Sequence, residues 1–173
     1  MKIGYDEANL SVGVTVLGFV IMFVTAWAAV LILYSMDKGL SFIENVFLYL
    51  VILTIGIHVS WVIAEEFKLV EITRDGLSYT GYLLYRTVAF PIFFVILINI
   101  IFKSKKIAAA LITAGLGIAV ILSLHGVLLF YRILEYKRWN LFYEAIHIAL
   151  LFAVGYGLLK AYRKLVYREV NAS

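Results

Sequence analysis

Ionisable side chains inside otherwise apolar segments are the residues of this sequence that could support chemistry, and there are five of them: His58, Arg86, His125, Glu144 and His147. Ionisable groups are rare in membrane-spanning segments and by default mark a functional site. Each histidine lies six residues from the end of its apolar run that faces the same side of the membrane. At about 1.5 Å per helical residue, all three imidazoles lie roughly 9 Å below one face. The sequence therefore predicts one polar layer at that depth.

Helical spacing predicts how the members of this layer meet. Glu144 and His147 are three residues apart, and Tyr82 and Arg86 are four apart, so each pair shares a helix face. His125 and His147 stand at equal distances from a short connection, which places them level on antiparallel neighbouring helices. We expect these two histidines to be adjacent and His58 to be the third member of the layer.

Haem b is the first cofactor that such a layer could hold, because imidazole nitrogens are common ligands of haem iron. Arg86 and Arg132 would contact the haem propionates. Helices joined by a short connection pack about 8–10 Å apart, too close to enclose a porphyrin between His125 and His147. A haem would therefore use His58 on one side and either His125 or His147 on the other. The protein would then be a haem-binding or redox membrane subunit in electron transport.

A zinc ion is the alternative cofactor. His58, His125 and His147 would leave one coordination position for water, the pattern of catalytic zinc sites. Glu144 or Glu65 would act as the general base that activates this water. At this depth the substrates would be lipid-like, so this interpretation predicts a membrane-embedded, zinc-dependent hydrolase.

A third interpretation involves no chemistry. Membrane histidines often form hydrogen bonds between helices, and the layer would then be a polar seam. The protein would be a membrane anchor or assembly subunit that contacts other membrane subunits or further copies of itself. In size and in its intramembrane histidines the chain resembles the small five-span subunits that anchor respiratory complexes, a likeness of architecture without a diagnostic motif.

The composition restricts the class of protein before any motif is considered. Of 173 residues, 64% are hydrophobic and 15% charged, and the mean hydropathy is +1.00. A soluble domain is about half apolar and about a quarter charged, so this is an integral membrane protein in contact with the lipid bilayer. The sequence has no cysteine, which excludes disulfides and thiolate ligands. The net charge of +4 lies between and after the apolar runs, and it indicates topology rather than nucleic-acid binding.

Five apolar runs are long enough to cross a bilayer, which needs about 20 helical residues. They predict a single multi-pass, all-α bundle with spans at about 12–34, 42–64, 82–102, 107–130 and 141–159. If the C-terminus is cytoplasmic, eight Lys and Arg residues flank the spans inside and six flank them outside. The bias of basic residues toward the cytoplasm therefore favours an N-out, C-in orientation.

One segment between spans suggests structure of its own. Residues 68–80 contain Asp75 and Gly76 between runs rich in β-formers, a pattern typical of a two-residue hairpin turn. A short β-hairpin or an irregular interfacial loop are the two alternatives for this segment.

Overall fold

The computed structural model describes residues 3–104 and 106–170. Within that part of the chain, five helical segments are long and apolar enough to cross a membrane: Gly13–Ser35, Phe42–Glu66, Gly76–Lys103, Ile107–Phe130 and Leu141–Val166. The prediction of a multi-pass helical bundle is confirmed at this level. The orientation in the membrane stays a prediction.

The helices differ from the predicted spans mainly at their ends. The first four segments are α1 (Ile3–Ser35), α2 (Phe42–Trp61) continued by the π-helical turn η1 (Val62–Glu66), α3 (Gly76–Leu84) continued through η2 (Tyr85–Ala89) into α4 (Phe90–Lys103), and α5 (Ile107–Phe130). The last is α6 (Leu141–Val170), which continues well past residue 159. The third span begins earlier than predicted because Asp75 caps it: its side chain accepts a hydrogen bond of 2.9 Å from the Ser78 N–H.

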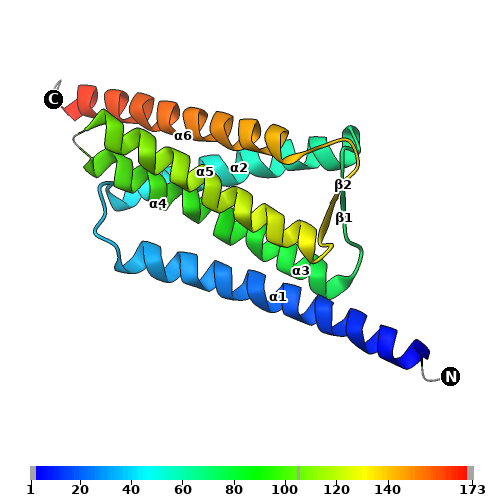
Figure 1. Ribbon diagram of the computed structural model, residues 1–173. Coiled ribbons are helices and arrows are strands. Elements are labelled where there is room, and N and C mark those ends of the chain that lie inside the picture. The colour runs from blue at the N-terminus through cyan, green and yellow to red at the C-terminus, as the bar shows by residue number, and fades with distance from the viewer. Residues whose placement is uncertain (1–2, 105, 171–173) are drawn as a thin grey trace.

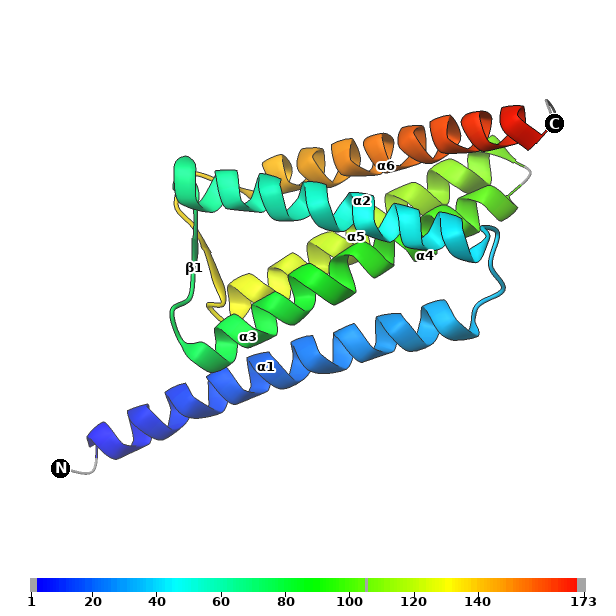
Figure 2. The same ribbon diagram turned by 180° about the vertical axis from the view of Figure 1, so that it is seen from behind.

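The α3–α4 segment lies in the middle of the bundle, with α1 along one side and α2 and α6 on the other (Figures 1 and 2). Its side chains Phe94, Val95 and Ile98 are fully buried. The outer helices instead expose many large apolar side chains, as helices in contact with lipid do. Two short strands, β1 (Val70–Ile72) and β2 (Leu134–Tyr136), lie at the end of the bundle where α6 begins (Figure 1). We call this the ribbon end.

The strands replace the hairpin proposed for residues 68–80. β1 pairs antiparallel with β2, with Val70 opposite Tyr136 and Ile72 opposite Leu134. The partner strand therefore comes from the α5–α6 connection, distant in sequence. Asp75 and Gly76 do not form a hairpin turn because the Asp75 side chain caps α3 instead.

Arg132 turns the chain from α5 into β2. Its φ is 52°, in the left-handed region that non-glycine residues seldom occupy. The Arg132 N–H bonds to the Leu129 carbonyl and the Ile133 N–H to the Leu128 carbonyl, the pair of bonds that defines a Schellman end. The backbone of Arg132 therefore ends α5. Its side chain is exposed and does not join the predicted polar layer.

Pro91 accounts for the irregular stretch in the central helix. Proline has no N–H, so the Thr87 carbonyl cannot receive the usual helical hydrogen bond from residue 91. The Tyr49 hydroxyl of α2 donates to that carbonyl instead, at 2.8 Å. One residue earlier, the Phe90 N–H reaches back five residues to Tyr85, which closes the π-helical turn η2. Such turns are common at functional sites.

The opposite end of the bundle is fixed by a buried amide, Asn99, whose side chain is 0% exposed. Its oxygen accepts hydrogen bonds from the Gly39 and Leu40 N–H groups, at 2.9 and 3.0 Å. Its nitrogen donates to the Asn45 side chain at 2.6 Å and to the Val95 carbonyl. Asn99 thereby ties the α1–α2 connection to α2 and α4.

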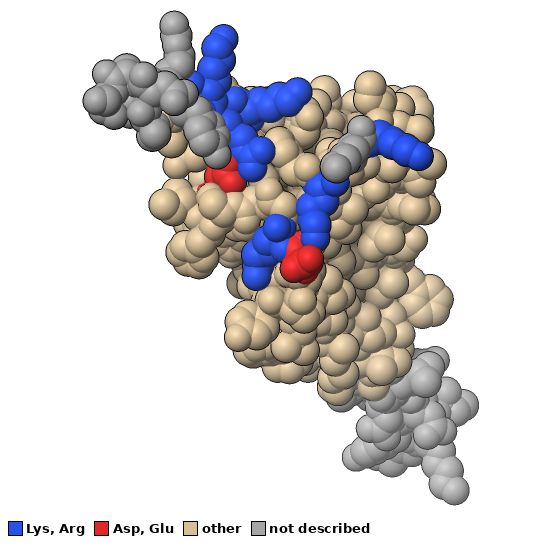
Figure 3. All heavy atoms as spheres, turned by 90° about the vertical axis from the view of Figure 1, so that its left-hand side faces the viewer, with Lys and Arg blue, Asp and Glu red and all other residues tan. Residues whose placement is uncertain are grey.

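Charged side chains gather at this opposite end as well (Figure 3). Arg163 of α6 pairs with Glu44 of α2, and Lys103 pairs with Asp37 at 3.0 Å. The acidic groups there are thus matched by basic partners, while further lysines such as Lys38 and Lys160 add positive charge. The basic residues at this end are among those on which the C-in prediction rests.

We expect Asn99→Leu to lower the free energy of unfolding by about 1–3 kcal/mol, because the Gly39 and Leu40 N–H groups lose their acceptor. Asn99→Asp, which keeps an acceptor oxygen, should lose less. Unfolding by SDS in mixed micelles measures both, with Ile100→Leu as the control at an adjacent exposed position. An Asn99→Leu protein as stable as the control would contradict the role assigned to this amide.

Candidate functional site

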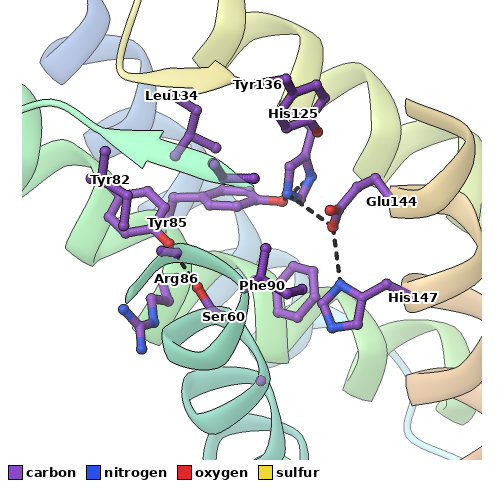
Figure 4. Close-up of a pocket in the computed structure, with 15 residues that line it drawn as sticks. Ser60, Tyr82, Tyr85, Arg86, Phe90, His125, Leu134, Tyr136, Glu144 and His147 are labelled. Carbon is purple, nitrogen blue, oxygen red and sulfur yellow. Dashed lines mark hydrogen bonds and ion pairs between the residues drawn. The ribbon is translucent and has the colours of Figure 1, made fainter. Parts of the chain in front are cut away.

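A buried carboxylate, Glu144, is the centre of the candidate site (Figure 4). It belongs to the first turn of α6, where carboxylates are favoured by the helix dipole. One of its oxygens lies 3.2 Å from His125 Nε2 and 3.2 Å from His147 Nδ1. The other accepts a hydrogen bond of 2.9 Å from the Trp139 indole N–H. Three N–H groups therefore surround one carboxylate.

This arrangement determines which ring nitrogens carry hydrogen. An ionised carboxylate only accepts, so His125 must donate from Nε2 and His147 from Nδ1. Nδ1 of neutral His125 is then an acceptor, and it lies 3.0 Å from the Tyr85 hydroxyl and 3.2 Å from the Ile121 carbonyl. The hydroxyl is the partner that can donate. Tyr85, His125, Glu144 and His147 thus form one continuous hydrogen-bonded chain.

The same geometry leaves Nε2 of His147 with a free lone pair. This atom is buried and has no hydrogen-bond partner among the described residues. The Nδ1 hydrogen bond to Glu144 fixes the ring orientation, as a carboxylate does for the catalytic histidine of a hydrolytic triad. Nε2 of His147 is therefore an oriented base.

A cavity of about 60 Å³ lies beside this chain, with room for a few water molecules. The β-ribbon closes it at the ribbon end, because side chains alternate along a strand. Val70, Ile72, Leu134 and Tyr136 line the cavity, whereas Glu71 and Glu135 are exposed on the other face. Lys137 bridges these two carboxylates at 3.0 and 2.8 Å, and the hydrogen bonds to them raise its pKa.

Three buried polar atoms of the cavity-lining residues have no hydrogen-bond partner in the described part of the chain: Arg86 Nε, Tyr136 Oη and His147 Nε2. Burial, with a smaller effect of the Glu144 carboxylate, raises the pKa of Tyr136, so its hydroxyl stays neutral. The set therefore contains one donor, one hydroxyl and one acceptor. Buried polar atoms are nearly always paired, so these three atoms on residues around one cavity call for polar partners such as water or a bound molecule.

Arg86 reaches the cavity from η2 of the central helix. Its Nη2 donates to the Ile57 carbonyl of α2 at 2.8 Å, and the guanidinium lies 5.9 Å from the Tyr82 ring centroid. The Tyr82 hydroxyl in turn bonds to Ser60 at 2.9 Å. These contacts hold Arg86 between α2 and the cavity.

Of the residues that the sequence predicts for the site, the structure brings four to the cavity: Arg86, His125, Glu144 and His147. His58 is exposed on α2, and its Nδ1 donates to the Thr54 carbonyl at 2.7 Å. Glu65 in η1 and Arg132 at the end of α5 are also exposed. The predicted convergence of three histidines is thus reduced to a pair. Residues 3–104 and 106–170 contain no group of three His, Asp or Glu that could hold a metal ion.

His58 instead lines an apolar groove of about 500 Å³ between α2 and α6. His147 and Ile63 line both this groove and the cavity, so they form the wall between the two. Trp139 lies in the groove as well, with its indole N–H on Glu144. The oriented base therefore stands between the cavity and an apolar surface groove.

Sequence reasoning missed three members of the site: Tyr85, Trp139 and Tyr136. Tyr85 directly precedes Arg86 and could have been suspected from its place in an apolar span. Trp139 and Tyr136 lie in the α5–α6 connection, where aromatic residues are ordinarily interfacial anchors. The place of Tyr136 depends on the pairing of β1 with β2, which no local pattern in the sequence indicates.

No protein-family model, curated protein or solved structure matches this chain.

The tautomers can be tested directly because the chain has three histidines. We expect nitrogen-15 NMR of histidine-labelled protein at neutral pH to show His147 and His58 protonated at Nδ1 and His125 protonated at Nε2. Single His→Gln variants assign the signals. A hydrogen on Nε2 of His147 in the neutral ring would contradict the geometry, because Nδ1 would then face the Glu144 carboxylate without a proton.

Proposed function

We propose that the protein binds the polar end of a lipid-phase molecule at His147 and exchanges a proton with it. The observation that carries this proposal is the buried Nε2 of His147, an acceptor without a partner in the described structure. Arg86 and Tyr136 line the same cavity, and the Arg86 Nε–H and the Tyr136 hydroxyl are donors for an oxygen of the same molecule. A hydroxyl compound meets both requirements, because its O–H can donate to Nε2 and its oxygen can accept.

His147 takes up the proton in this proposal. In a pair of a histidine and a carboxylate, the carboxylate stabilises the imidazolium that forms when the ring takes up a proton. Glu144 supplies this support at 3.2 Å. Its other partners, His125 and Trp139, keep the carboxylate in place when the charge on His147 changes. The chain onward to Tyr85 offers a path along which hydrogen bonds can reverse.

The apolar α2–α6 groove is an argument that the ligand enters from the membrane. Its lining includes Val59, Val62, Ile146 and Leu150, which suit an acyl or isoprenoid chain. His147 lies at its inner wall, so a chain in the groove would bring its polar end to Nε2.

A haem b in the same groove is the second candidate. His58 and His147 both line it, and each donates from Nδ1, which leaves Nε2 as the nitrogen that would ligate iron. His125 is less suited, because both of its ring nitrogens already have partners. Neither Arg86 nor Arg132 lines the groove, so propionate contacts would come from other residues.

A zinc-dependent hydrolase receives less support from the geometry. Its three ligands would include His58, which lines the groove, and His125, which lines the cavity. The proton-exchange proposal requires the His147–Glu144 pair alone.

A long-chain alkyl nitrophenol tests the proposal, because its phenol and phenolate forms absorb at different wavelengths. In lipid bicelles at fixed pH, we expect the wild-type protein to raise the phenolate fraction several-fold over protein-free bicelles, because His147 accepts the phenol proton. His147→Gln should abolish the increase.

His58→Gln is the matched control: it removes the other groove histidine and should leave the phenolate signal unchanged. An equal phenolate fraction in wild type and His147→Gln would overturn the proposal. A Soret band in the purified protein that both His→Gln changes remove would favour haem instead.

A further inference from the structure

A second hollow, of about 430 Å³, opens between η1 and α3. Its lining includes the charged residues Glu65, Arg74 and Arg86 and the aromatic residues Trp61 and Tyr79. Trp61 is 51% exposed and Tyr79 is 41% exposed. Aromatic residues of this kind sit at the level of lipid headgroups, so the hollow lies where headgroups would be.

The hollow adjoins the cavity directly. Ser60, Ala64, Ile72 and Arg86 line both spaces. Arg86 stands at this junction with one nitrogen committed to the Ile57 carbonyl and its buried Nε without a partner in the described chain. A guanidinium has five N–H donors in a planar fork, which suits a carboxylate or phosphate group.

We propose that this hollow binds the acidic group of an anionic amphiphile, such as a fatty acid or acidic lipid. Arg74 and Arg86 supply two positive charges, and Glu65 supplies one negative charge, so the lining favours an anion on balance. The buried, unpaired Nε of Arg86 is the second observation, because it needs an acceptor that an anionic oxygen provides. The inference rests on the proposed function, since it names the class of molecule whose polar end reaches His147.

The hollow and the cavity together indicate which parts such a molecule must have. Its acidic group would lie in the hollow, and a hydroxyl near that group would enter the cavity and donate to His147 Nε2. A neutral lipid of equal length would lack the contact with Arg86 and Arg74. Selectivity for the anion is thus the property that distinguishes this inference from binding at His147 alone.

Trp61 can report on the hollow in the otherwise unchanged protein, because the tryptophan quenching that Trp61→Phe removes is due to Trp61. The probe is a long-chain fatty acid brominated next to its carboxyl group, since bromine quenches tryptophan at contact. We expect the acid in bicelles to quench Trp61 at a concentration about fivefold or more below that of its methyl ester. Arg86→Gln and Arg74→Gln should each reduce this preference, and Glu65→Gln should increase it.

Lys68→Gln is the matched control, because Lys68 lines a neighbouring hollow and carries the same charge. Since Arg74 is exposed, its substitution tests the inference without disturbing the fold. Equal quenching by acid and ester would overturn the inference. If soluble bromoacetate quenched Trp61 at the same concentration as the long-chain acid, the assignment to an amphiphile would be overturned. The carboxylate alone would then be enough for binding. The proposed function fails separately, through the nitrophenol signal at His147.

Discussion

A carboxylate inside an apolar helical bundle must find hydrogen-bond donors for both oxygens, because burying an unpaired charge is very costly. Glu144 meets this requirement with three N–H groups, from His125, His147 and Trp139. These donors come from α5, from α6 and from the connection between them. The single carboxylate therefore determines the tautomers of two histidines, the place of an indole and the direction of the free lone pair on His147.

The surrounding fold serves to hold and enclose this group. The pairing of β1 with β2 closes the cavity with Tyr136 and Leu134. Pro91 removes a helical hydrogen bond from the central helix near the turn that carries Arg86. At the other end, Asn99 and the Glu44–Arg163 pair fix α2 against α4 and α6, far from the cavity. The contacts that join the helices at one end of the bundle are therefore separate from the functional groups at the ribbon end.

The sequence predicted the five spans and the adjacency of His125 and His147, because both follow from apolar length and from equal distances to a short connection. It could not predict that His58 faces outward, since depth does not set the rotation of a helix about its axis. It also associated Arg132 with a cofactor, whereas its backbone ends α5 with a φ of 52°. The pairing of β1 with β2 joins segments distant in sequence, and local patterns at Asp75 and Gly76 could not reveal it.

The ionised state of Glu144 is the most direct test of this account, because every assigned tautomer follows from it. Infrared difference spectra between wild type and Glu144→Gln at neutral pH measure it, with Glu65→Gln as the exposed control. We expect the wild type to contribute carboxylate stretching bands and no protonated carboxyl band. A protonated carboxyl band that disappears in Glu144→Gln, and persists in Glu65→Gln, would contradict it.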